Sequence, residues 1–89
     1  MKFSKKFTNK LVSYVDRYFT YDYRAMRVED KNNLFDFYAH RSGTTVVIDR
    51  CPTGGIYISI KKDERYIYKN IAKSFAEIKN FKHMILCLG

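Results

Sequence analysis

Three short groups of turn-forming residues divide the middle of the chain into four stretches of strand-forming residues. The groups are Asp30-Lys31-Asn32-Asn33, Arg41-Ser42-Gly43-Thr44 and Pro52-Thr53-Gly54-Gly55. The stretches cover about residues 20–29, 34–40, 45–51 and 56–61 and are rich in β-branched and aromatic residues. Because such short breaks leave no room for a crossover connection, we predict an antiparallel meander of four strands.

Antiparallel pairing also predicts which side chains share a face of the sheet. Four-residue loops in the first two hairpins place Val28 opposite Phe35 and Met26 opposite Phe37. They likewise place Ala39 opposite Val46 and Phe37 opposite Ile48. A three-residue loop in the third hairpin places Ile48 opposite Ile60. One predicted face is apolar and contains Met26, Val28, Phe35, Phe37, Ala39, Val46, Ile48, Ile56, Ile58 and Ile60. The opposite face is polar and rich in tyrosine: Tyr21, Tyr23, Arg27, Asp36, Tyr38, His40, Val47, Asp49, Tyr57, Ser59 and Lys61.

The segments on either side of the meander have apolar residues at helical spacing. Phe3, Phe7, Leu11, Tyr14 and Tyr18 predict a helix over about residues 4–18. Ile67, Ile71, Phe75 and Ile78 predict a second helix over about residues 64–80, with Asp63 as its N-cap. The closing HMILCLG is an apolar run, which we interpret as a last, mostly buried strand.

Together these elements predict one α+β domain covering residues 1–89. Its order is a helix, a four-stranded antiparallel meander, a helix and a final strand, with both helices packed on the apolar face of the sheet. The final strand can add only at an edge. We expect it antiparallel beside the first strand, with a parallel position beside the fourth as the alternative.

The net charge of +8 is concentrated at the two ends of the chain. Residues 1–11 contain four lysines and no acid, and residues 61–89 contain seven basic residues against three acids. The segment between them is neutral. This uneven distribution indicates a partner of negative charge.

Two basic rows are the candidate nucleic-acid-binding residues. On the first predicted helix they are Lys6, Lys10 and Arg17, and on the second they are Arg65, Lys69 and Lys73, with Lys62 next to them. If both helices lie on one face of the sheet, the two rows become neighbours. We therefore expect a small, non-enzymatic nucleic-acid-binding protein that recognises backbone and shape, with RNA favoured over DNA.

Tyrosine has a high strand propensity and suits a half-exposed sheet, so ordinary surface residues are the simplest interpretation of the tyrosine-rich face. Two further hypotheses concern binding. Tyr21, Tyr23, Tyr38 and Tyr57 could stack bases, but the neutral charge of this face fits a protein contact better. A homodimer through this face or through the last strand is one form of such a contact. A regulator or inhibitor of a host enzyme, of the phage or mobile-element type, is another.

The sequence gives less support to a catalytic site, a metal site or a membrane span. A toxin-like, metal-independent ribonuclease could use His40 beside Tyr23 with Arg41, but His40 has no acid partner. His40, Cys51, His83 and Cys87 lack the short spacings of a zinc site, so we expect no metal or cofactor. Phosphate-binding loops and nucleophile elbows are absent from the sequence. No apolar run reaches the about 18 residues of a membrane span, and the start has no signal-peptide pattern, so we expect a cytoplasmic protein.

Overall fold

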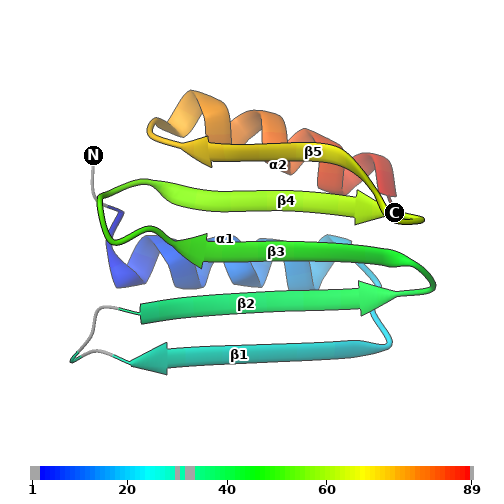
Figure 1. Cartoon of the computed structure of the whole chain (residues 1–89), viewed down its shortest axis with the longest axis horizontal. Helices are drawn as coiled ribbons and strands as arrows, with labels where there is room; N and C mark the ends of the chain where they lie inside the picture. The colour runs from blue at the N-terminus through cyan, green and yellow to red at the C-terminus, as the bar shows by residue number, and fades with distance from the viewer. Residues whose placement is uncertain (1–2, 30, 32–33, 89) are drawn as a thin grey trace.

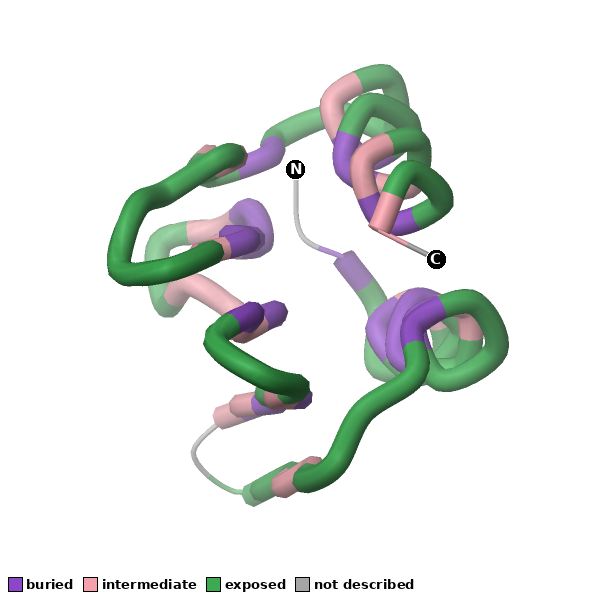
Figure 2. Tube along the Cα trace, turned by 90° about the vertical axis from the view of Figure 1, so that its right-hand side faces the viewer, coloured by how far each residue is buried: buried purple, intermediate pink, exposed green. Residues whose placement is uncertain are grey.

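The computed structural model describes residues 3–29, 31 and 34–88 as an α+β fold with two helices and a five-stranded antiparallel sheet. The strands lie in the sheet in their chain order (Figure 1). Figure 2 shows the sheet on one side of the molecule and both helices on the other. The elements are α1 (Lys5–Tyr18), β1 (Tyr23–Glu29), β2 (Leu34–Arg41), β3 (Thr44–Arg50), β4 (Ile56–Lys62), β5 (Arg65–Ala72) and α2 (Phe75–Leu88).

The first helix and the first four strands are confirmed to within about three residues of their predicted ends. The predicted pairs Val28 with Phe35 and Phe37 with Ile48 are also observed. The third hairpin differs, because Ile48 pairs with Ile58 and residues 51–55 form a five-residue loop. The shift is by two residues, so every side chain keeps its predicted face. The predicted turn residues Asp30, Asn32 and Asn33 lie outside the described residues.

The last third of the chain contradicts the prediction. Residues 65–72 form strand β5 and not the start of a helix, and residues 83–88 of the segment predicted as a final strand belong to α2. Asp63 is therefore no N-cap. It lies with Glu64 in a two-residue hairpin turn, where both residues have positive φ angles of 50° and 67°. Turns of this kind match the right-handed twist of the strands they join.

Helix α2 begins at a capping box. The Glu77 carboxylate accepts hydrogen bonds from the backbone N–H groups of Lys73 and Ser74, and the Ser74 hydroxyl accepts one from the backbone of Glu77. These bonds satisfy donors that the first turn of a helix leaves unpaired. Ser4 is the N-cap of α1, because its Oγ accepts a hydrogen bond from the backbone N–H of Phe7.

One apolar core lies between the sheet and the helices. The sheet contributes Phe35, Phe37, Ala39, Val46, Ile48, Ile56, Ile58, Ile60 and Ala72 to it. The helix layer and its ends contribute Phe3, Leu11, Val12, Val15, Phe19, Ile78, Phe81 and Ile85. Met26 shares the inner face but remains 45% exposed, since it lies on the edge strand β1 and the helices lie behind β2 to β5 (Figure 1).

Candidate nucleic-acid interface

Helices α1 and α2 run parallel and side by side behind the sheet (Figure 1). At their first turns the ring of Phe75 packs edge-on against Phe3 and Phe7, with centroids 5.7 and 5.2 Å apart. In the middle, the Tyr14 hydroxyl on α1 donates a hydrogen bond to the backbone oxygen of Lys82 on α2, at 3.3 Å. These contacts make the two helices one layer with a single outward surface.

Helix α1 places its predicted basic row on that outward surface. Lys6, Lys10 and Arg17 are all exposed. At about 100° per residue they lie roughly opposite the buried stripe that contains Leu11 and Val15. The row extends about 17 Å along the helix at 1.5 Å per residue.

Helix α2 adds Lys79 and Lys82, which the sequence analysis did not identify. Lys79 is exposed, and the Lys82 ammonium lies 4.9 Å from the centroid of the Tyr14 ring. Neither residue was predicted as part of a basic row, because the second helix was predicted about ten residues too early. The spacing of Ile78, Phe81 and Ile85, which form the buried side of α2, was the signal that could have located them.

Asp16 and Glu77 are the two acidic residues of the helices, and both carboxylates bind other groups of the same chain. Asp16 forms a two-pronged ion pair with the guanidinium of Arg24 on β1, at 2.9 and 3.1 Å. Glu77 caps the start of α2, and its hydrogen bonds, chiefly from the backbone of Lys73, lower the pKa of its carboxyl group. Among the described residues, none of Lys6, Lys10, Arg17, Lys79 and Lys82 forms an ion pair.

The second predicted basic row does not exist as a row. Lys62 and Arg65 face each other across the β4–β5 turn, Lys69 lies on the open sheet face opposite Ser59, and Lys73 precedes α2. The apolar stripe predicted on the opposite side of the same helix is wrong in part, because Ile67, Ile71 and Phe75 are 41%, 48% and 57% exposed and only Ile78 is buried. These four residues therefore do not form a second basic row beside the row on α1.

The open face of the sheet carries the predicted tyrosines with one exception. Tyr23, Tyr38 and Tyr57 lie on it, whereas Tyr21 precedes β1. The rings of Tyr23 and Tyr38 are 5.6 Å apart, and the hydrogen bond between their hydroxyls raises the pKa of Tyr38. On β4 and β5 of the same open face, the ammonium groups of Lys61 and Lys69 lie 5.4 and 4.8 Å from the ring centre of Tyr66.

Two aspartates face each other on the same open surface. Asp36 on β2 pairs directly with Asp49 on β3, and Arg27 forms an ion pair with Asp36 at 3.2 Å. Partial burial raises the pKa of Asp49 to about 6, and the neighbouring Asp36 carboxylate contributes to the shift. Two carboxyl groups this close favour sharing one proton.

The residues suggested for a ribonuclease point to different sides of the sheet. His40 pairs with Tyr23 as predicted, and its Nδ1 lies 2.9 Å from the Thr45 hydroxyl on the open face. Arg41 is the next residue in the strand, so its side chain lies on the helix side. Arg41 therefore cannot hold a phosphate beside His40.

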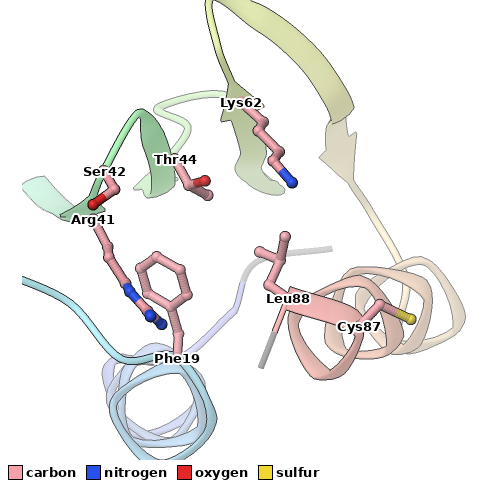
Figure 3. A pocket seen from close by; sticks show the side chains of 7 residues that line it. All are labelled: Phe19, Arg41, Ser42, Thr44, Lys62, Cys87 and Leu88. Carbon is pink, nitrogen blue, oxygen red and sulfur yellow. The ribbon is translucent and has the colours of Figure 1, made fainter.

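Arg41 instead lines a pocket of about 220 Å³ at the ends of both helices (Figure 3). The side chains of Arg41 and Lys62 point from the sheet toward this end of the helix layer (Figure 3). Helix C-termini carry partial negative charge, so cations that point toward this end are favourably placed. The pocket is lined by Phe19, Arg41, Ser42, Thr44, Lys62, Cys87 and Leu88.

Within the described part of the chain, no group of three or more His, Cys, Asp or Glu side chains is placed to hold a metal ion. No helix that the structure describes is long and apolar enough to cross a membrane. Comparison with protein families, curated proteins and solved structures found no match to this chain. Support for a functional site therefore comes only from the side chains of this chain.

Proposed function

We propose that this chain is a non-enzymatic nucleic-acid-binding protein that holds phosphates along the outward surface of α1 and α2. The proposed contacts are Lys6, Lys10, Arg17, Lys79 and Lys82. This set retains the three α1 residues predicted from the sequence and replaces the second predicted row with two residues of α2.

One observation supports the proposal most directly: both acids of the helix layer are used internally. The Asp16 carboxylate binds Arg24, and the Glu77 carboxylate caps its own helix. Lys6, Lys10, Arg17 and Lys79 are exposed and Lys82 is half-buried, and none of these five forms an ion pair among the described residues. A surface that served only for solubility would more often mix both signs of charge.

The dimensions of the basic surface suit a nucleic-acid backbone. The α1 row of about 17 Å corresponds to about five phosphates of one strand at the 3.4 Å charge spacing of DNA. Two helices lying side by side form a broad surface, whereas a major groove about 12 Å wide admits one protruding helix. RNA presents a wide, shallow minor groove or single strands, so RNA is favoured over DNA.

The test is the salt dependence of binding to a generic RNA. Five phosphate contacts predict a log–log slope of affinity against salt of about −3.5 for single strands and about −4.5 for a duplex. The triple variant Lys6→Gln, Lys10→Gln, Arg17→Gln should flatten the slope by about two to three units. It should also weaken binding at least about tenfold at about 50 mM salt.

The chain offers a control with the same loss of charge. In the triple variant Lys62→Gln, Arg65→Gln, Lys73→Gln, three exposed cations away from the α1 row are removed. We expect this variant to keep most of the slope and affinity of the parent. Equal losses in both variants would indicate an effect of net charge alone, and a larger loss in the control would return the site to the residues between 62 and 73 that the sequence first suggested. Either result, or a parent slope near zero, contradicts the proposal.

A further inference from the structure

The open face of the sheet has opposite charges at opposite corners. Asp36 and Asp49 lie side by side on β2 and β3, in the row that continues to Tyr57 on β4. Lys69 lies on β5, one row further toward the other end of the strands, and Lys61 lies on β4, two rows further. Arg27 forms an ion pair with Asp36. Asp49 forms none among the described residues.

The area between the two corners is suited to packing against another surface. Tyr38, Val47 and Ser59 form the row across the centre of this face, in which Ser59 is buried and Tyr38 and Val47 remain accessible. No helix covers them, because both helices lie on the other side of the sheet (Figure 2). Tyr38 is 39% exposed, and exposed tyrosine is typical of the centre of protein interfaces.

Such a face is complementary to itself. A two-fold axis that lies in the interface, perpendicular to the line joining the corners, exchanges them. It places the aspartate pair of one copy against the lysine pair of the other, and it does so twice. The central rows of the two copies then meet face to face, as sheets do in sandwich packing.

We infer that the chain forms a homodimer by packing the open sheet faces of two copies together, with Asp36 and Asp49 opposite Lys61 and Lys69 of the second copy. Five strands at about 4.8 Å and seven residues at about 3.3 Å give a flat footprint of about 550 Å² per copy. This area is near the lower limit of about 600 Å² per partner for specific interfaces, so the dimer should be reversible. The helix layers remain on the two outer sides.

A charge-exchange experiment tests this dimer. One variant carries Lys61→Glu and Lys69→Glu, and the other carries Asp36→Lys and Asp49→Lys. Each should lose self-association at least about tenfold, because like charges then meet across the interface. An equimolar mixture should recover a dimer, since one copy then supplies only acids and the other only lysines.

The measurement is sedimentation equilibrium at about 100 mM salt, where the charges are only partly screened. The protein is first freed of nucleic acid, so that RNA cannot bridge two copies. Lys62→Gln with Arg65→Gln removes two charges that lie off this face and should leave the dimer unchanged. Val47→Arg, at the centre of the face, should abolish it and provides a second test if the aspartate variant fails to fold.

Several results would overturn the inference. A parent protein that is monomeric at about 1 mM excludes the dimer and leaves the open face to a different protein. A dimer that persists in Val47→Arg uses another surface. Two folded exchange variants that fail to associate with each other show that these charges do not meet.

Discussion

The Tyr14 hydroxyl donates a hydrogen bond to the backbone oxygen of Lys82, and the Lys82 ammonium lies 4.9 Å from the centre of the Tyr14 ring. One aromatic side chain on α1 thus contacts both the backbone and the charged end of one residue on α2. The half-buried position raises the pKa of Tyr14, chiefly through desolvation, so its hydroxyl stays protonated and able to donate. This pair fixes how the two basic helices lie against each other.

Tyr14→Phe should destabilise the fold by about 0.5–1.5 kcal/mol, because it removes the hydrogen bond and keeps the ring. For a domain of this size the melting temperature should fall by several degrees, at about 4–8 °C per kcal/mol. Thermal unfolding followed by circular dichroism measures the change. Tyr18→Phe is the control, since Tyr18 is exposed and should tolerate the loss of its hydroxyl. Equal effects in both variants would mean that the hydroxyl of Tyr14 contributes nothing specific.

Glu64→Gly should stabilise the protein by about 0.5–1 kcal/mol. Glu64 has a φ of 67° in the β4–β5 turn, where a side chain is strained and an Asp-Gly pair is preferred. Gly43→Ala in the β2–β3 turn should have the opposite effect on stability. Its φ is 85°, and a Cβ there would lie 2.9 Å from Asp63 Oδ1, so the protein should lose stability. Urea unfolding of both variants gives the two signs, and a destabilised Glu64→Gly would contradict the strain.

The sequence predicts the first four strands well because their signals agree with one another. Turn-forming residues, β-branched residues and the alternation of apolar residues all indicate the same boundaries. The third hairpin was shifted because a three-residue and a five-residue loop both keep Ile56, Ile58 and Ile60 on the inner face. The reason for Gly55 in this loop is visible only in the structure. A Cβ at this position would lie 2.9 Å from the backbone oxygen of Ala72.

The segment over residues 64–80 was mispredicted because two patterns compete in it. Ile67, Ile71 and Phe75 have helical spacing, but the aromatic and β-branched run from Tyr66 to Tyr68 favours a strand. A strand is formed because Tyr68 and Ala72 then complete the inner face beside β4. The local signal for the true helix was present in Ser74 and Glu77, which have the spacing of a capping box. The site residues Lys79 and Lys82 were missed for the same reason.

Asp49→Asn should stabilise the monomer at pH 7.5, by about 1 kcal/mol or less, and have little effect at pH 4. The pKa of Asp49 is raised to about 6 in the folded state by burial and by Asp36. Between about pH 4 and 6 the folded state therefore binds more protons than the unfolded state, so stability falls as the pH rises. Above pH 6 the full cost of the charged pair remains, reduced by solvent screening.

This change is measured by thermal unfolding at concentrations where sedimentation finds no dimer. Asp22→Asn is the control, since Asp22 is exposed and lies before β1, with no carboxylate across a strand. Its effect should be the same at both pH values. An Asp49→Asn variant that destabilises the monomer at pH 7.5 would refute the repulsion between the two aspartates.

His40→Ala should leave RNA binding and any biological activity unchanged. His40 lies on the open face with Thr45 as its neighbour, and Arg41 lies on the opposite side of the sheet. A labelled RNA incubated with the parent and the variant should remain intact on a denaturing gel in both cases. Cleavage by the parent that is lost in His40→Ala would favour the ribonuclease hypothesis over binding.

Lys79→Gln with Lys82→Gln should weaken RNA binding without unfolding the protein, and this tests whether both helices take part. Gln has a helix propensity close to that of Lys, Lys79 is exposed, and the Tyr14 hydrogen bond uses the backbone of Lys82. The free energy of unfolding should therefore change by less than about 1 kcal/mol. Each lost phosphate contact should flatten the salt slope by about one unit, giving about two for the pair. Since the α1 row lies on a different helix, its Gln triple variant should add to this effect. If the α2 pair leaves the slope unchanged while the α1 triple flattens it, the nucleic acid follows α1 alone.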